Sequence, residues 1–405
     1  MANSKDVSIV RDLAKRYMEL ANLPIMAERK RLWTALKDLR AERPMILMEV
    51  NNIEEVISDA ELQCEEDNMR SLELSLRWSI RQVEEVGDDM VIEPVWKIGW
   101  HIRGTDYGVP IESRHAQEAS IAYRFVNPIR TPADIEKLKP RTWSVNREAT
   151  LAHKEKLENI FGDILPVKLH GSRGMNACLT SPLFQLLSME NMMMWMFDEP
   201  AALHRLMSYL RDDRRAYLHW MEKEKLLGLN NDSAEAGSGS PGFTTALPAP
   251  DYNGTARLKD IWVWVDSQET VAFAPKHFVE FFLPYMAEAS KDFGLVYYGC
   301  CEPVHDRWEA IIKAIPQIRA VSISPWCDMP KMGEMLGKNY VFSRKPMPSY
   351  ISGANPDWEL LRKEVQDTLN AAKNCNLEFI FRDLYDLGGD RTRLKKWVEM
   401  VRGMM

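Results

Sequence analysis

Cysteine is scarce in this sequence, and long apolar runs are missing from it. The six cysteines stand at positions 64, 178, 300, 301, 327 and 375 of 405 residues, a sparse spacing that excludes a disulfide framework and suits a reducing compartment. No apolar run reaches the roughly 18 residues of a membrane span, and the first residues hold no apolar core of signal-peptide length. We therefore expect a cytoplasmic protein without membrane contact.

A surplus of basic charge and several catalytic motifs are also absent. The 52 basic and 59 acidic residues leave a net charge of -7, so neither nucleic acid nor an anionic membrane is an expected partner. The motifs G-x-S-x-G, G-x-x-x-x-G-K-[ST] and H-E-x-x-H do not occur, which removes three large enzyme classes from consideration. No glycine-rich dinucleotide fingerprint follows any expected strand.

What the sequence does contain is a regular alternation of short β-branched or aromatic stretches with helical patterns. This alternation is typical of βα units around a parallel sheet. We predict a TIM (β/α)8 barrel over residues 44–405 and an N-terminal helical extension over 1–43. Nine strand candidates compete for eight places, so one of them is wrong or lies outside the barrel. The candidates are 44–50, 89–96, 164–171, 226–233, 261–269, 294–298, 318–326, 339–346 and 377–384.

Helices and loops are predicted between these strands. Residues 59–86 form an amphipathic pattern that Gly87 closes. Residues 97–129 contain glycine and proline without periodicity, and 233–250 are rich in Ser, Gly, Pro and Ala, so we predict two long loops. The second loop is a candidate lid. The apolar run Met189–Met196 is a candidate homodimer face.

The most informative stretch is Gly294–Trp308, which reads GLVYYGCCEPVHDRW. A strand here runs into a loop with Cys300, Cys301, Glu302 and His305, residue types that bind a borderline-soft metal or hold a thiolate. Vicinal side chains point in opposite directions, so at most one of the two cysteines faces the site. The alternative is that both are buried as small apolar residues and that His305 only starts a helix.

Polar residues recur at the ends of the other predicted strands, where barrel enzymes place their active groups. A metal site would draw on Cys301 or Cys300 with Glu302 and His305, and with His170, Glu269 or Asp383 from other strands. Alternatively, such residues cap helices, and Asp383 pairs with Arg382 or Arg391. The polar residues at these strand ends are Glu49, Glu93, His170, Asn231, Asp232, Asp266, Gln268, Glu269, Ser324, Arg344, Lys345, Arg382 and Asp383.

The run from Ile261 to Asp328, with its YYGCCEP motif, resembles the uroporphyrinogen decarboxylase-like superfamily. More narrowly, it is similar to the branch found beside corrinoid-dependent methyltransferase systems. The resemblance continues through Arg382, Asp383 and residues 391–401, more weakly through 181–210, and covers roughly the last 240 residues. It implies a TIM barrel, in agreement with the alternation of strands and helices.

The sequence departs from the family pattern at several positions, and these departures limit which activity and which cofactors we expect. True uroporphyrinogen decarboxylases carry an arginine-rich segment near the first strand, whereas PMILMEVNNIEEV (44–56) is acidic and lacks arginine. Family methyltransferases hold zinc with an H-x-C pair and a further cysteine. Here Tyr298 and Cys300 stand at the pair, with Cys301 one residue on, and Arg382 or Asp383 near the last cysteine, so zinc would need another ligand set. D-x-H-x-x-G, which presents histidine to cobalt, is absent, so cobalamin would arrive on a separate corrinoid protein.

We therefore expect a methyltransferase that moves a methyl group between a small O- or N-methylated substrate and cobalamin. The alternatives are a cofactor-free decarboxylase, in which Asp383 or Glu269 stabilises a protonated intermediate, and a non-catalytic corrinoid-binding protein. Metal binding or activation of the leaving group is assigned to Cys300, Cys301, Glu302, His305, Asp383 and Glu269. Binding of substrate or cofactor is assigned to His170, Gln268, Tyr297, Tyr298, Trp326 and Arg382.

Overall fold

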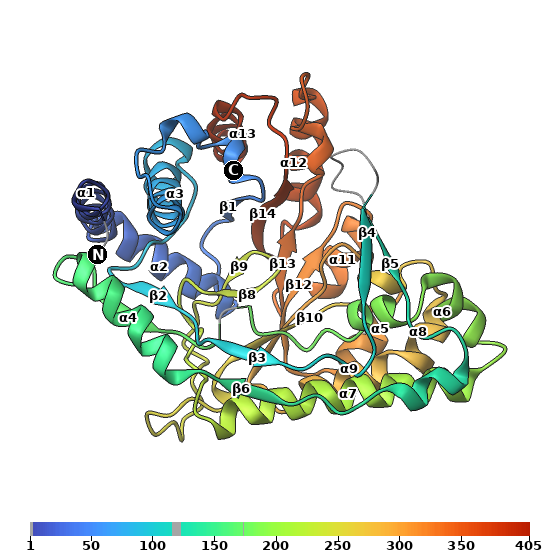
Figure 1. The fold of residues 1–405 in the computed structure, drawn as a ribbon. Coiled ribbons are helices and arrows are strands. Elements are labelled where there is room, and N and C mark those ends of the chain that lie inside the picture. The colour runs from blue at the N-terminus through green and yellow to red at the C-terminus, as the bar shows by residue number, and fades with distance from the viewer. Residues whose placement is uncertain (1–2, 116–122, 173) are drawn as a thin grey trace.

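A curled parallel sheet lies at the centre of the molecule (Figure 1). The computed structural model describes residues 3–115, 123–172 and 174–405, and within these residues the sheet has six strands. All neighbouring strands in it are parallel, as helical crossover connections require. In spatial order they are β1 (Met45–Val50), β14 (Asn376–Leu384), β13 (Val341–Arg344), β12 (Ile318–Ile323), β11 (Leu295–Tyr298) and β10 (Trp262–Val265).

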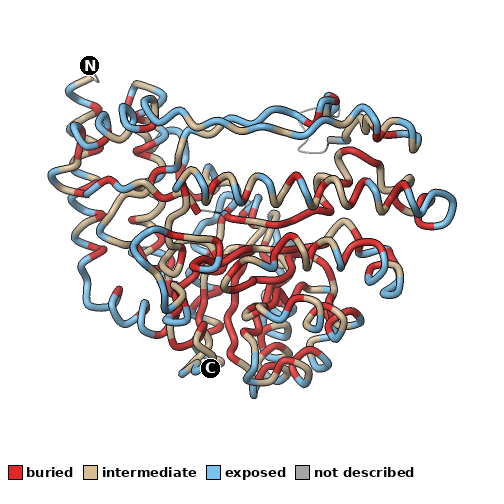
Figure 2. Tube along the Cα trace, turned by 90° about the horizontal axis from the view of Figure 1, so that it is seen from below, coloured by how far each residue is buried: buried red, intermediate tan, exposed pale blue. Residues whose placement is uncertain are grey.

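Helices cover the outer face of this sheet. Phe379 and Phe381 of β14 pack on Trp397 of α13 (Thr392–Met404), with ring centroids 6.0 and 4.8 Å apart. Each fully buried side chain of this size contributes about 1.5–3 kcal/mol. Figure 2 shows that burial is concentrated in the central strands. The same outer core includes residues of α5 (Thr180–Leu186), α6 (Met189–Trp195), α7 (Pro200–Lys223), α8 (Pro275–Phe281), α9 (Leu283–Ser290), α10 (Trp308–Ala314), α11 (Met329–Leu336) and α12 (Trp358–Ala371).

The inner face of the sheet encloses a short hairpin, β8 (Glu235–Gly237) and β9 (Ser240–Pro241). A Cβ atom on Gly237 would lie 2.6 Å from the Tyr297 ring, and one on Gly239 would lie 2.3 Å from Glu49 Oε2. Glycine is therefore needed at both positions for the hairpin to fit. The prediction of a flexible lid over 233–250 is wrong, because the segment is a buried plug whose Ser238 and Ser240 are fully enclosed.

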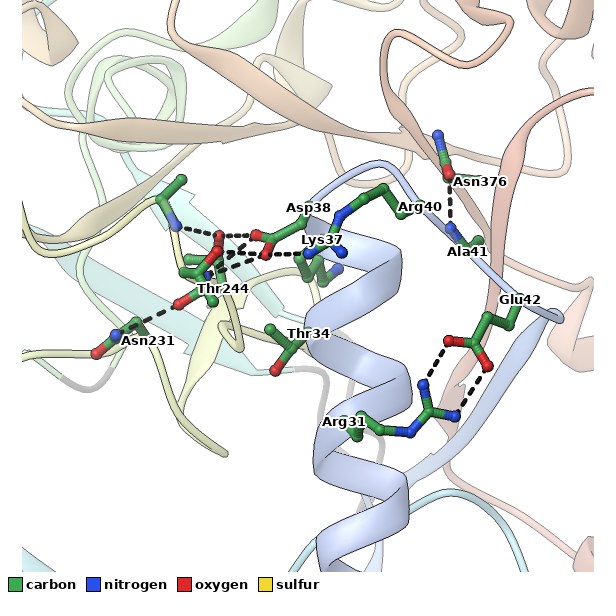
Figure 3. A network of polar contacts seen from close by, with 12 residues as sticks. Arg31, Thr34, Lys37, Asp38, Arg40, Ala41, Glu42, Asn231, Thr244 and Asn376 are labelled. Atoms are coloured by element: carbon green, nitrogen blue, oxygen red, sulfur yellow. Dashed lines mark hydrogen bonds and ion pairs between the residues drawn. The ribbon is translucent and has the colours of Figure 1, made fainter.

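The amino end of the sheet is closed by α2 (Pro24–Lys37), which follows α1 (Ser4–Ala21). Leu36 and Trp33 join the inner core, and Lys37 Nζ donates to Glu378 Oε2 of β14 at 2.6 Å. Figure 3 shows the contacts around the end of the helix, where Asp38 accepts hydrogen bonds from Thr244 and Thr245. The predicted division of the chain at residue 43 stays a prediction.

A second core lies beside the sheet, under α1. Trp96 stacks edge-on between Tyr17 and Phe161, with both pairs of ring centroids 6.2 Å apart. The elements of this core are α1, α3 (Asp67–Arg81), α4 (Arg147–Phe161), β2 (Trp96–Ile98) and β7 (Val167–Leu169). Two antiparallel pairs lie farther out: β3 (Ile102–Gly104) with β6 (Trp143–Val145), and β4 (Glu112–His115) with β5 (Tyr123–Val126).

Side chains, rather than a neighbouring strand, satisfy the free edge of β1. Asp89 Oδ2 accepts from Ile46 N and Asp88 Oδ2 accepts from Met48 N, both at 2.9 Å. Gln82 Nε2 donates to Met48 O at 2.8 Å. These bonds meet the requirement that buried backbone groups be paired, so β2 pairs with β7 instead of β1. The fold is TIM-like, but backbone pairing does not close the barrel in the described part of the chain.

Several sequence predictions hold and others need correction. Seven of the predicted strands contain strands of the structure, whereas β2 begins only at the end of 89–96 and no strand lies in 226–233. The helix predicted from residue 59 starts at Asp67, although Gly87 does close it in a left-handed conformation. The loop predicted over 97–129 contains most of β2 together with β3, β4 and β5. No helix in the described ranges has the length and apolarity that crossing a membrane requires.

Candidate functional site

Glu302 anchors the loop that follows β11. The carboxylate is 1% exposed, and it accepts hydrogen bonds from the backbone N–H groups of Ser267, at 2.8 Å, and Cys300, at 2.9 Å. Burial raises the pKa of this carboxyl, and the two N–H donors oppose the rise. Both oxygens are thus engaged in joining the ends of β10 and β11.

The two vicinal cysteines form a coupled thiol pair at the carboxyl end of β11. Cys300 Sγ and Cys301 Sγ lie 3.7 Å apart. The contact raises the pKa of the Cys300 thiol and lowers that of the Cys301 thiol. Cys300 is buried and Cys301 is half-buried, but the contact between the two Sγ atoms shows that the side chains do not point in opposite directions as predicted.

The other sequence-predicted ligands are dispersed. His305 Nδ1 accepts from Asp328 N at 3.2 Å, and Glu269 Oε2 accepts from Thr180 Oγ1 at 2.6 Å. No group of three or more His, Cys, Asp or Glu side chains in the described ranges is placed to hold a metal ion. Glu302 and His305 use the atoms that could bind a metal to accept hydrogen bonds from backbone N–H groups. The predicted set of zinc ligands therefore does not fit zinc in this arrangement. Zinc stays a prediction.

Arg382 and Glu49 form an ion pair at the ends of β14 and β1. Arg382 Nε lies 3.2 Å from Glu49 Oε2, and Nη1 donates to Ser238 Oγ at 2.9 Å. Neither Glu49 Oε2 nor Arg382 Nε has a hydrogen-bond partner among the described residues. Burial raises the pKa of Glu49, and Arg382 opposes it only in part. Asp383 Oδ1 lies 4.0 Å from Arg382 Nε, on a left-handed residue with a φ of 61°.

Tyr297 and Tyr298 are buried rather than open to a pocket. Tyr298 Oη lies 3.0 Å from Ser267 Oγ, and Tyr297 Oη donates to Ser343 Oγ at 2.8 Å. Lys345 Nζ donates to both Tyr297 Oη and Ser343 Oγ at 2.9 Å. Burial lowers the pKa of Lys345 to about 7. Asp266, at the end of β10, is also buried, and burial with the nearby Glu302 raises its pKa.

Two further predicted residues lie near the rim of the carboxyl end. Trp326, in the loop after β12, is 59% exposed. Gln268 begins a single 3-10 turn after β10 that also contains Glu269. Gln268 lies next to Ser267, whose backbone N–H is held by Glu302.

A cavity of about 510 Å³ opens where β1 and β2 fail to pair. Glu49 reaches it from β1, and the plug contributes Glu235 and Gly239. The helices α1, α2 and α3 close its far side. Aromatic side chains in its wall are Tyr17, Trp33, Trp78, Trp96 and Phe243, and polar ones include Glu93, Lys97, His170, Ser233, Ser75, Ser79 and Gln82.

A polar cluster forms the wall opposite Glu49. Lys97 Nζ donates to Glu93 Oε2 and Asp232 Oδ2, each at 2.6 Å, and Ser233 Oγ also donates to Glu93 Oε2 at 2.6 Å. His170 Nε2 lies 3.0 Å from Leu229 O and 4.0 Å from Asp232 Oδ2. Burial lowers the pKa of His170, and Asp232 offsets it in part, so the imidazole is neutral at pH 7.

Sequence reasoning placed His170 and Arg382 beside this region but missed the importance of Glu49, Glu93 and Lys97. Glu49 and Glu93 both appeared among the strand-end residues. What could have singled out Glu49 is its acidic side chain at an inward position of a strand whose alternate residues are apolar. Lys97 gave no signal, because β2 is too short to show a period.

Comparisons with known proteins agree with this architecture. No protein-family model matches the sequence, and no curated protein matches it either. A solved structure described as a methyltransferase from Methanosarcina mazei superposes with a TM-score of 0.52 at 11% identity. The superposition covers 92% of this chain and 98% of that chain, so the two share a fold over nearly their whole lengths.

Proposed function

We propose that this protein is a methyltransferase that takes a methyl group from a small O- or N-methylated compound and passes it to a corrinoid held on a separate protein. The observation that carries the proposal is Glu49. Glu49 is the last but one residue of β1. It lines the cavity, burial raises its pKa, and its Oε2 has no hydrogen-bond partner among the described residues. Such a group is suited to deliver a proton inside a pocket.

The proposed transfer of a methyl group from oxygen or nitrogen requires a proton donor. A methyl group leaves oxygen or nitrogen readily only when the heteroatom departs as a neutral species. Burial raises the pKa of Glu49 and so favours its protonated form, and Arg382 Nε at 3.2 Å would stabilise the carboxylate once the proton has left. The proton would return from solvent through the open side of the cavity.

The corrinoid would supply a strongly nucleophilic cobalt that accepts the methyl group. Two exposed aromatic side chains fit a flat corrin face at the carboxyl end of the sheet: Trp326, 59% exposed, and Tyr385, 50% exposed. They follow β12 and β14, on the same end as Cys301 and Asp383. The shared fold with a methyltransferase supports the proposal, as does the resemblance of the YYGCCEP stretch.

The test is an anaerobic assay with free cob(I)alamin and a panel of methoxylated aromatics, methanol and methylated amines, followed by the loss of cob(I)alamin absorbance. We expect one donor class to be consumed in a protein-dependent manner. Glu49→Gln should reduce the rate at least about 100-fold, because a positioned acid contributes roughly 10²–10⁴-fold. The matched control is Glu280→Gln, an exposed glutamate on α8. Unchanged turnover by Glu49→Gln would remove Glu49 from the reaction.

A further inference from the structure

The cavity between β1 and β2 has a wall of unusual composition. Three tryptophans, Trp33, Trp78 and Trp96, line it together with Tyr17 and Phe243. Trp78 and Trp96 are half-buried and so keep surface open to a ligand. Ring faces carry negative electrostatic potential, and aromatic walls are the way proteins bind alkylated ammonium ions.

Acidic charge exceeds basic charge in the same wall. Lys97 is flanked by two carboxylates, Glu93 and Asp232, each 2.6 Å from its Nζ. Hydrogen bonds from Lys97 and Ser233 lower the pKa of Glu93 despite its burial, so it is ionised at neutral pH. Glu235 adds a further acidic side chain to the lining, and its Oε1 already accepts from Gly239 N at 2.7 Å.

The remaining charged groups of the lining do not reverse this balance. Asp89 pairs outside the cavity with Arg43 and Arg402, each at 2.9 Å. Glu49 pairs with Arg382, which does not itself line the cavity, and His170 is neutral. Among the charged residues that line the cavity, Glu49, Asp89, Glu93 and Glu235 outnumber Lys97. An anionic ligand would therefore meet a wall of net negative charge, whereas a cation would gain from both the charge and the rings.

We propose that this cavity binds a small methylated ammonium cation, with its N-methyl groups among the aromatic side chains and its charge opposite Glu93 and Glu235. The volume of about 510 Å³ lies in the range of small-ligand pockets. The assignment of this cation as the methyl donor rests on the proposed function, whereas its binding does not.

With such a donor the methyl transfer balances as follows. The bond between the methyl carbon and nitrogen breaks, and its electron pair stays on nitrogen. The methyl carbon bonds to the electron pair that the reduced corrinoid provides, so the nitrogen leaves as a neutral amine. The amine leaves neutral without a proton from the protein, so with this donor Glu49 only protonates the released amine, and the large effect of Glu49→Gln on turnover is expected for ether donors.

The experiment is isothermal titration calorimetry of the full chain with choline and with its uncharged isostere, 3,3-dimethyl-1-butanol. The two probes have the same shape and differ in charge, so we expect choline to bind at least about tenfold more tightly, which corresponds to about 1.4 kcal/mol. Equal affinity, tighter binding of the alcohol, or no binding of choline would overturn the inference.

Substitutions place the probe in the cavity. Trp78→Leu and Glu93→Gln should weaken choline binding at least about threefold, whereas Lys97→Met should strengthen it because a positive charge is removed. Trp358→Leu on α12 is the matched control, because Trp358 is half-buried but does not line the cavity. Near-ultraviolet circular dichroism verifies that each variant is folded. Unchanged affinity in both folded wall variants, or a loss in Lys97→Met, would overturn the site.

The outcome also separates the inference from the proposed function. Choline that binds in the cavity but yields no methyl transfer supports the cation site and counts against the donor role. Turnover of an ether donor by a protein that does not bind choline overturns the cation site and leaves the methyltransferase proposal standing.

Discussion

Two ion pairs occupy inward positions on the same strand, β14, with Ile380 between them, and they differ in how completely they are satisfied. At the amino end, Glu378 accepts from Lys37 at 2.6 Å and from Ser240 at 2.7 Å, and Lys37 also donates to Ser240. At the carboxyl end, Arg382 faces Glu49, and in the part of the chain that the structure describes neither Glu49 Oε2 nor Arg382 Nε has a hydrogen-bond partner.

The difference separates a structural pair from a functional one. A buried charge is tolerated only when its hydrogen-bonding capacity is met. In the N-terminal pair, Lys37 with Glu378, both side chains are fully buried, and Lys37 Nζ and both oxygens of Glu378 take part in hydrogen bonds. The C-terminal pair, Glu49 with Arg382, keeps spare capacity beside a cavity. Atoms with unused hydrogen-bonding capacity in a partly buried ion pair can bind a substrate or a proton.

The largest effect is expected from breaking the N-terminal pair. Lys37→Met removes the cation that is hydrogen-bonded to the buried Glu378 and leaves the charge of Glu378 opposed by the nearby Lys345, which should lower the free energy of unfolding by up to about 3–5 kcal/mol. The double variant Lys37→Met with Glu378→Met should recover most of this loss. Urea denaturation measures both, with the exposed Lys363→Met as the control. A single variant as stable as that control would show that the pair is not structural.

At the C-terminal pair, Glu49 with Arg382, we expect a small effect on stability and a large effect on turnover. Glu49→Gln should change the free energy of unfolding by less than about 1 kcal/mol, because the pair is partly exposed, while it reduces turnover at least about 100-fold. Denaturation and the corrinoid assay on the same preparation give both numbers. A loss of stability like that of Lys37→Met would erase the distinction between the two pairs.

The plug sets the position of Glu49, and this contact can be tested alone. Gly239→Ala would place a Cβ 2.3 Å from Glu49 Oε2 at a φ of 78°, which should destabilise the protein by about 1–3 kcal/mol. Gly389→Ala is the control, since it has a φ of 72° with nothing within 4 Å. The thermal midpoint of Gly239→Ala should be the lower of the two. Equal midpoints would mean that the strained conformation alone accounts for the loss.

A pH dependence of the free energy of unfolding is expected from Lys345. Burial lowers its folded pKa from 10.5 to about 7, so between these values the unfolded chain binds more protons than the folded one. The free energy of unfolding should therefore rise with pH in this window, by up to about 1.4 kcal/mol per unit, and not below pH 7. The difference between wild type and Lys345→Met, from denaturation at several pH values, isolates this slope. A flat or falling difference would contradict a lowered pKa.

The sequence predicted the central sheet well, because its strands are apolar runs whose pattern does not depend on distant partners. The sequence did not predict the places where a side chain, instead of a neighbouring strand, makes hydrogen bonds to the backbone of a strand. Asp88 and Asp89 complete the edge of β1, and two carboxylates in a loop give no sign of this. From the sequence, the serine- and glycine-rich plug was predicted to be a flexible loop. Only the fold shows that its small residues fit against Tyr297 and Glu49.

The candidate site was predicted in part. The sequence indicated the carboxyl ends of the strands and named His170 and Arg382, which lie at the cavity and at the C-terminal pair. The loop with Cys300, Cys301 and Glu302 drew attention because its residue types are chemically reactive. In the fold, Glu302 is an anchor for backbone N–H groups. Residue type alone could not distinguish that role from catalysis, nor reveal a cavity formed by helices distant in the sequence.

The most direct test of a functional C-terminal pair is the pKa of Glu49 itself, measured by carbon-13 NMR titration of labelled glutamate carboxyls. Comparison of wild type with Glu49→Gln identifies the resonance. The account predicts a midpoint above the ordinary glutamate value of 4.5, because burial outweighs Arg382. A midpoint at or below that value would mean that Glu49 is a permanent carboxylate partner of Arg382, and it would contradict the proposed role of Glu49 as proton donor.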